Sequence, residues 1–237
     1  MKKRLFAIGT LIAATAFFVA CGGNDNDNEE QTTTAETTTE AAEGTGEGAD
    51  LGPGGVQPIQ RELAPSRGIW TDNTWSSQYL GLSFTLPTGW SALTDEDISA
   101  TLELGLGVFD YFGEVLPDDL NALVDVMAIS EAGIANVQIT FERLDPNFVG
   151  ITDADYVEFA ALGVQLIGGT AHQDLPTVQI GNQTWYQLAT ELDFGIGVIM
   201  HGRQFINISG EFVRMIIISY PEGHSPVDVI LNSFSGI

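Results

Sequence analysis

The chain has 237 residues, of which 32 are acidic and only 8 are basic, and its formal net charge is −24 at pH 7. Phosphate backbones and anionic lipid headgroups repel a chain this acidic, so nucleic-acid binding is excluded. With a single cysteine there is no internal disulfide, and stability has to come from a hydrophobic core.

The first 20 residues have the layout of a secretory signal peptide. Residues 1–4 contain three basic side chains, residues 5–20 carry no charge, and the small Ala20 precedes Cys21. The uncharged run is shorter than the roughly 20 residues of a membrane-spanning helix, which disfavours a retained transmembrane segment. Removing this signal takes away both lysines, and leaves five arginines against 32 acidic residues, a net charge of −27.

Residues 18–21, Phe-Val-Ala-Cys, resemble the lipobox of bacterial lipoproteins, with Phe18 where an aliphatic residue is usual. The resemblance implies that Cys21 carries a diacylglyceryl group, usually with an N-acyl chain as well, and becomes the new N-terminus. Two or three acyl chains anchor firmly, because each buried methylene adds about 0.8 kcal/mol. The alternative is an ordinary signal peptide with an incidental cysteine. We expect a lipid-anchored protein on the extracytoplasmic side of the cell membrane.

Residues 21–66 predict a disordered tether. An Asn/Asp/Glu run is followed by a Thr/Glu/Ala/Gly tract, and almost nothing apolar offsets the entropy of ordering. A flexible coil of this length has a root-mean-square reach of roughly 35–40 Å, and charge repulsion extends it. Composition leaves O-glycosylation of the threonines open. We interpret the segment as a spacer that lifts a domain off the membrane.

Residues 67–237 have a globular composition and are long enough for one buried core. Hydrophobic periodicity and turn residues predict strands at 68–70, 74–79, 81–86, 124–130, 136–144, 177–192 (turning at Gly181), 198–208 and 212–220. Capping residues predict helices over 94–104, with a continuation toward 111, over 152–167, and from 225 to close the chain.

Two strands carry more specific information. The clean alternation of 136–144 favours a sheet with one wetter face, and the apolar residues on both sides of 212–218 favour a central strand. Short turns between successive strands indicate a mostly antiparallel, twisted sheet with about three helices packed on it. The predicted fold class is therefore α+β, in a single domain.

Residues 79–90, Tyr-Leu-Gly-Leu-Ser-Phe-Thr-Leu-Pro-Thr-Gly-Trp, precede a helix start at Thr94. This stretch resembles the opening of small Mog1/PsbP-like lipoprotein domains. The resemblance implies an α+β sandwich and a class whose members are mostly binding or assembly factors. It transfers no ligand-binding or catalytic residue, because the matching positions have structural explanations.

Residues suited to catalysis or metal binding are sparse. His172, His201 and His224 lie far apart in sequence, and none has a partner at metal-ligand spacing. For His201, in mid-strand, a cross-strand hydrogen bond is the favoured role. No serine lies in a Gly-x-Ser-x-Gly elbow. Asp193-Phe194-Gly195 matches the metal-binding motif of kinases, but the chain after the signal peptide contains no lysine to hold ATP. We expect no enzyme activity, no metal and no cofactor.

A surface argument remains. If the strands pair as predicted, one wetter face carries Gln138, Thr140, Trp185, Gln187, His201, Arg203 and Arg214. Trp and Arg are favoured at binding hot spots, so the last five form a candidate binding surface. The alternative is that Trp185 lies in the core and that the arginines pair with neighbouring carboxylates.

The sequence thus predicts a membrane-anchored module that binds, or assembles with, an unidentified protein of the cell envelope. The competing hypothesis is a small-molecule or lipid carrier, with a cavity between sheet and helices lined by Phe109, Tyr111 and Phe112. A hydrolase of unfamiliar type is a third possibility, and would need a polar cleft with perturbed carboxylates or His201.

Overall fold

The computed structural model describes residues 66–101, 122–145, 148, 150–193 and 197–237. The predicted signal peptide, Cys21 and the tether as far as residue 65 lie outside the described residues. The part of the predicted helix after residue 101 and the three aromatic residues of the carrier hypothesis also lie outside the described residues. The described residues form two antiparallel sheets and three helical segments, which confirms the α+β class.

The larger sheet contains the centre of the fold, and each of its neighbouring strand pairs is antiparallel. Its strands follow the spatial order β4 (Trp90–Ala92), β5 (Ala122–Ser130), β6 (Asn136–Arg143), β11 (Phe212–Pro221), β10 (Ile199–Ser209), β9 (Gln183–Asp193) and β7 (Thr170–His172). The short strand β8 (Val178–Ile180) forms a hairpin with β9. Strand β11 lies in the middle, as its apolar sequence predicted.

The smaller sheet has the order β1 (Ile69–Thr71), β2 (Thr74–Ser77), β3 (Leu82–Thr85) and β12 (Phe234–Gly236). Its last strand corrects the prediction that the chain closes with a helix. Helix α4 (Val227–Leu231) spans only five residues, and Pro226 occupies its N-cap without a side-chain hydrogen bond. The chain then pairs with β3, and Phe234 stacks on Phe84 with ring centroids 4.8 Å apart.

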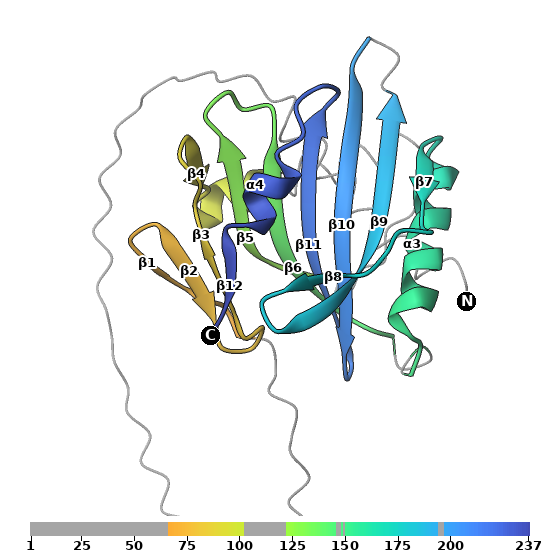
Figure 1. Ribbon diagram of the computed structural model, residues 1–237, viewed down its shortest axis with the longest axis horizontal. Helices are drawn as coiled ribbons and strands as arrows, with labels where there is room; N and C mark the ends of the chain where they lie inside the picture. The colour runs from red at the N-terminus through yellow and green to blue at the C-terminus, as the bar shows by residue number, and fades with distance from the viewer. Residues whose placement is uncertain (1–65, 102–121, 146–147, 149, 194–196) are drawn as a thin grey trace, which may run out of the picture. The chain divides into compact units, whose positions relative to one another are not determined.

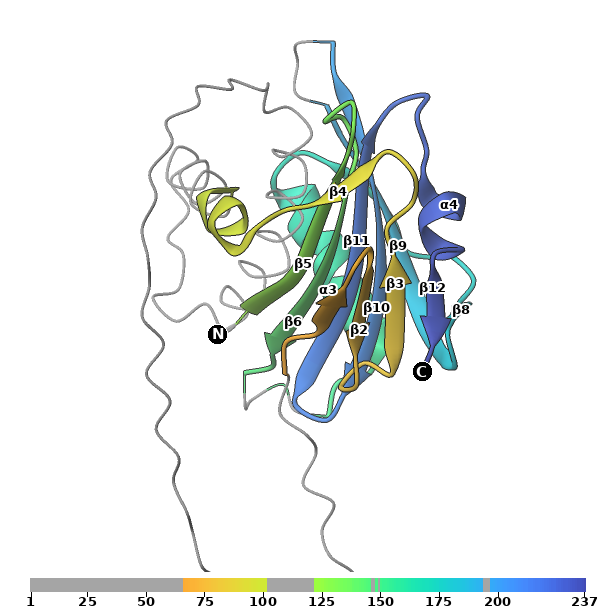
Figure 2. The same cartoon turned by 90° about the vertical axis from the view of Figure 1, so that its left-hand side faces the viewer.

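The large sheet is covered on both faces. Helix α3 (Asp153–Leu166) packs against one face, and the small sheet and α4 pack against the other (Figures 1 and 2). We call these the α3 face and the α4 face. Thr152 caps α3 through a reciprocal pair of hydrogen bonds with Asp155, as the sequence predicted. Within the described residues, no helix has the length and apolar content to cross a bilayer.

Each face has its own hydrophobic cluster. On the α4 face, Trp185 and Phe205 pack with Trp75 and Phe84 of the small sheet. The α3-face cluster joins side chains of β9, β10 and β11 to the helix: Leu188, Ile206, Val213, Met215 and Ile217 with Tyr156, Val157, Ala160 and Ala161. The central strands are therefore buried from both sides.

The alternation of β6 was interpreted wrongly. Val137, Ile139 and Phe141 lie on the α4 face, as expected from an apolar side of a strand. The polar residues Gln138 and Thr140 alternate with them on the α3 face, but both are fully buried. Because layers cover both faces of this sheet, the polar side of β6 does not face solvent.

Candidate functional site

Trp185 does not belong to an exposed binding surface. Its side chain is 0% exposed and lies in the α4-face cluster, where the β8 hairpin pairs Val178 with it. The corresponding part of the predicted surface is wrong for a physical reason: a large aromatic ring next to a covering hairpin gains more by burial than by exposure.

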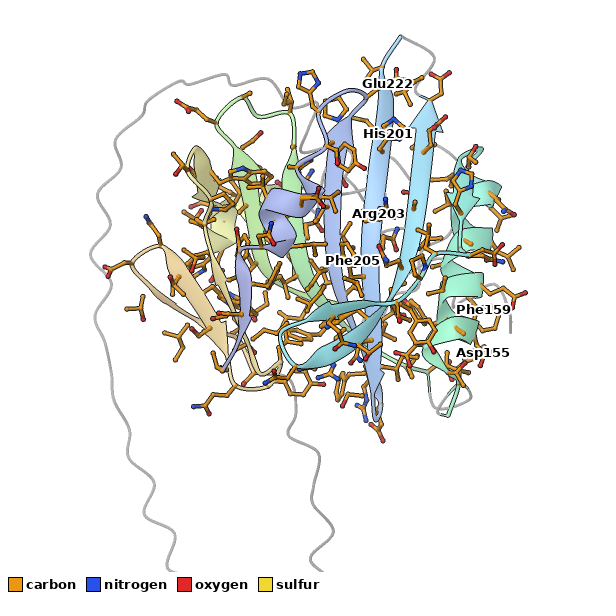
Figure 3. All side chains as sticks on the ribbon, in the orientation of Figure 1. Asp155, Phe159, His201, Arg203, Phe205 and Glu222 are labelled. Carbon is orange, nitrogen blue, oxygen red and sulfur yellow. The ribbon has the colours of Figure 1, made fainter. Side chains whose placement is uncertain are left out.

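Three of the predicted residues do lie together, at the end of the α4 face beyond the aromatic cluster. Gln187, His201 and Arg203 come from the adjacent strands β9 and β10, project from the same side of the sheet, and are only partly buried. Figure 3 labels His201 and Arg203 along β10, next to the buried Phe205. We call Gln187, His201 and Arg203 the arginine patch.

His201 is held by its neighbours on both sides. Its ring stacks against Tyr220 of β11, with centroids 5.8 Å apart and an interplanar angle of 23°. Its Nδ1 lies 3.9 Å from the Glu191 carboxylate on β9. That separation is too long for the predicted cross-strand hydrogen bond, and the two side chains would form an ion pair only with a protonated imidazole.

Arg203 is the unusual member of the patch. Its Nε is buried and has no hydrogen-bond partner, and its Nη1 lies 3.5 Å from the Gln187 side-chain oxygen, at the outer limit of a hydrogen bond. Gln187 is itself oriented, because its amide nitrogen donates to the Pro176 carbonyl. Among the residues that the structure describes, no carboxylate forms an ion pair with Arg203.

Other arginines do find carboxylates. Arg67 pairs with Asp95 at 2.6 Å, and Arg143 pairs with Glu211 at 2.9 Å. The alternative drawn from the sequence, that the strand arginines form salt bridges, therefore holds for Arg143 and does not hold for Arg203. Among the described residues, Arg203 therefore differs from Arg67 and Arg143 in having no carboxylate within ion-pair distance.

Arg214 lies elsewhere on the α4 face. It donates to the Asn207 side-chain oxygen, its register partner, and its guanidinium lies 6.0 Å from the centre of the Tyr79 ring. Asn207 is four residues from Arg203 along β10, about 13 Å at the rise of a strand, and the buried Phe205 lies between them. The two arginines do not share one patch.

The α3 face contains a buried acid that the sequence did not single out. Glu142 is 1% exposed, and the Tyr156 hydroxyl of α3 donates to it. Burial raises the pKa of Glu142 to about 7, although the hydrogen bond from Tyr156 acts in the opposite direction. The pKa of Tyr156 rises well above its ordinary value, through burial first and the nearby carboxylate second. In the sequence, only the alternation of polar and apolar residues along β6 indicated on which side of the strand Glu142 lies.

The polar residues Gln138 and Thr140 were predicted to share a face with the arginines, and this is wrong. Both lie on the α3 face, on the side opposite to Arg203. Neither amide atom of Gln138 has a hydrogen-bond partner, nor does the Thr140 hydroxyl. Thr190 and Ser219, on the same face, also have unpartnered hydroxyls, and sequence reasoning missed both.

The described part of the chain contains no assembled set of metal ligands. No group of three or more His, Cys, Asp or Glu side chains there could hold a metal ion. His172 lies in β7 and His224 is exposed next to a turn, so the histidines do not converge. The absence of a cofactor and of catalysis stays a prediction.

Comparison with known proteins assigns no family. No protein-family model matches the chain, and no curated protein matches it. Among solved structures, a cyanobacterial PsbP (CyanoP) from Synechocystis sp. PCC 6803 matches with 14% identity and a TM-score of 0.42, over 74% of this chain and 99% of that one.

Two further structures match. LpqN of Mycobacterium tuberculosis, described as involved in cell envelope biogenesis, has 12% identity and a TM-score of 0.33, over 65% of this chain and 82% of its own. A Bacteroides thetaiotaomicron VPI-5482 protein has 10% identity and a TM-score of 0.39; 70% of this chain matches 48% of it, so the chain spans about half its length. At these values the matches assign no function to this chain.

Proposed function

We propose that this protein is a lipid-anchored extracytoplasmic module that binds another protein of the cell envelope through the arginine patch. The observation that carries the proposal is Arg203: a partly buried guanidinium, with a buried unpartnered Nε and no carboxylate partner in the described structure. No catalytic step is assigned to it.

The chemistry of Arg203 favours a carboxylate on the partner. A guanidinium presents a planar fork of donors that matches a carboxylate bidentately, and such charge-assisted bonds are strong where water is partly excluded. Arginine is also enriched among the few residues that dominate the energy of protein interfaces. In a chain with 32 acidic residues, one arginine that pairs with none of the described ones is available to an outside group.

The anchor and tether belong to the same proposal. A lipid on Cys21 would hold the chain at the membrane, and the segment up to residue 66 would let the domain reach partners above the bilayer. Cys21→Ala should shift the protein from the membrane fraction to the soluble fraction after cell lysis. Retention in the membrane fraction would remove the anchor and leave the test of the patch unaffected.

The patch is tested by site-specific photo-crosslinking of the full chain in its native envelope. A photo-reactive amino acid replaces Gln187, and a matched control places it at Glu158, an exposed position of α3. Amine-reactive linkers are unsuitable because the mature chain would contain no lysine. We expect one dominant adduct from position 187 that is absent from position 158. Adducts of equal yield at both positions, or none at 187, would contradict the proposal.

A further inference from the structure

His172 lies beside the arginine patch, on the same face of the large sheet. Strand β7 pairs His172 with Ala189 of β9, and β9 pairs Ala189 with Arg203 of β10. Ala171, the residue before His172, packs against the α3-face cluster, so His172 projects from the opposite, α4 face. At about 4.8 Å per strand, the backbones at His172 and Arg203 lie roughly 10 Å apart.

Ala189 lies between two longer side chains that carry nitrogen donors. Its methyl group is short and partly exposed, while His172 is exposed and Arg203 is partly buried. Gln187 and Glu191 lie two residues before and after Ala189 on β9, and project from the same face. A group bound over Ala189 would therefore meet a guanidinium on one side and an imidazole on the other.

The charge around Ala189 depends on pH. Histidine is the side chain that ordinarily changes its charge between pH 5 and 8. The Nδ1 of His201 lies 3.9 Å from the Glu191 carboxylate, so a protonated His201 would pair with Glu191 and offset its negative charge. A protonated His172 would add a positive charge opposite Arg203. Both changes favour an anion over Ala189.

The other charged groups at this end of the α4 face are exposed carboxylates. They follow the ends of β7, β9 and β11, with Glu222 next to His201 in Figure 3: Asp174, Asp193 and Glu222. From β11, Tyr220 meets His201 with the face of its ring. The acidic residues of α3 lie on the other face of the sheet. An exposed carboxylate is already ionised at about pH 5.5, so between pH 5.5 and 7.5 the histidines supply the change in charge.

This arrangement defines both the kind of partner and its control. We infer that an acidic side chain of the partner binds over Ala189, between Arg203 and His172, and that protonation of His172 and His201 strengthens this contact. The inference rests on the proposed function, since it concerns the same partner and the same patch. The guanidinium fork can donate to one side of the carboxylate, and an imidazolium can donate to the other.

Photo-crosslinking of the full chain in isolated native envelopes tests the inference, with the photo-reactive residue at position 187 and irradiation at about pH 5.5 and about pH 7.5. A partly exposed ion pair changes binding by up to about five-fold. We expect the yield of the dominant adduct to be about 3-fold or more higher at the lower pH. His172→Gln should bring this ratio toward 1. His172→Arg, with a fixed charge, should raise the yield at the higher pH.

The matched control is His224→Gln, at an exposed histidine in the turn after β11. We expect its pH response to equal that of the unaltered protein. Equal adduct yields at both pH values, or a response that His172→Gln leaves unchanged, would overturn the inference while partner binding through Arg203 stands. Absence of any adduct at either pH would overturn the proposed function, and the inference with it.

Discussion

The two faces of the large sheet are both buried, yet they differ in chemistry. The α4 face is aromatic where the small sheet covers it and ends in the partly exposed arginine patch. The α3 face is aliphatic under the helix, but it also contains Glu142 and a group of uncharged polar side chains with unpaired atoms. Burial alone therefore does not separate core from site in this fold, and neither do unpaired polar atoms, because the core residues Trp75 and Trp185 also have a buried Nε1 without a partner.

Trp185→Ala should have the largest effect on stability, because it removes a buried ring from the hydrophobic cluster of the α4 face. The ring is 0% exposed, and truncating a buried tryptophan costs about 3–5 kcal/mol of unfolding free energy. Urea unfolding followed by circular dichroism measures this change. Ile69→Ala, at a residue 71% exposed, serves as control and should change stability by about 0.5 kcal/mol or less. A loss below about 1 kcal/mol for Trp185→Ala would mean that the ring is not part of the core.

The α3 face should make stability depend on pH through Glu142. Its pKa is about 7 in the folded state against 4.5 for the free side chain, so the folded state binds this proton more tightly than the unfolded chain does. The contribution of Glu142 is therefore fully present below about pH 4.5 and is lost as pH rises to about 7, by up to roughly 3 kcal/mol. Glu142→Gln should flatten this part of the profile.

Unfolding free energies between pH 4.5 and 8 measure the effect, with Glu211→Gln as control because Glu211 is exposed and paired with Arg143. Equal pH profiles for Glu142→Gln and the unaltered protein would show that Glu142 titrates as an exposed acid.

Helix α3 covers the α3 face of the large sheet, and this packing depends on a stable first turn of the helix. Thr152→Ala removes the hydroxyl that accepts from the Asp155 amide, and should cost about 1 kcal/mol. Thr152→Ser keeps the hydroxyl and should lose little. The same cap lowers the pKa of Asp155 through hydrogen bonds from Thr152, so Thr152→Ala should also bring that pKa back up in NMR titrations. An unshifted Asp155 would contradict the capping box.

The smallest effect on stability is expected at the arginine patch. Arg203→Met removes a buried Nε without a partner and breaks no ion pair among the described residues, so stability should change by less than about 1 kcal/mol, or rise. Thermal unfolding measures it. A loss of several kcal/mol would show that Arg203 is a structural residue, and would remove the basis for a partner site there.

Much of the fold was predictable because local signals agree with it. The capping boxes at Thr94 and Thr152 are as expected, and the turn at Gly181, where φ is +58°, joins β8 to β9. The missed strands β4, β7 and β12 have three residues each and form through pairing with distant strands, which short-range patterns do not contain. Phe234 reaches Phe84 across 150 residues of chain.

The site was predictable in part for a related reason. Alternation correctly placed Gln187, His201 and Arg203 on one face, because the side-chain period of a strand is two. The same alternation wrongly placed Gln138 and Thr140 with them. The pattern along one strand does not show which face of the sheet its polar residues occupy. Whether Trp185 is covered, and whether Arg203 meets a carboxylate, depends on packing between segments far apart in sequence.

The most direct test of partner binding combines the photo-reactive residue at position 187 with exchange of the arginine. Adduct yield in the native envelope is compared for Arg203→Met and for Arg143→Met, which removes an exposed, paired arginine of another strand. We predict that the dominant adduct falls about 10-fold or more with Arg203→Met and is unchanged with Arg143→Met. An adduct that persists in Arg203→Met would contradict the assignment of Arg203 as the residue that binds the partner.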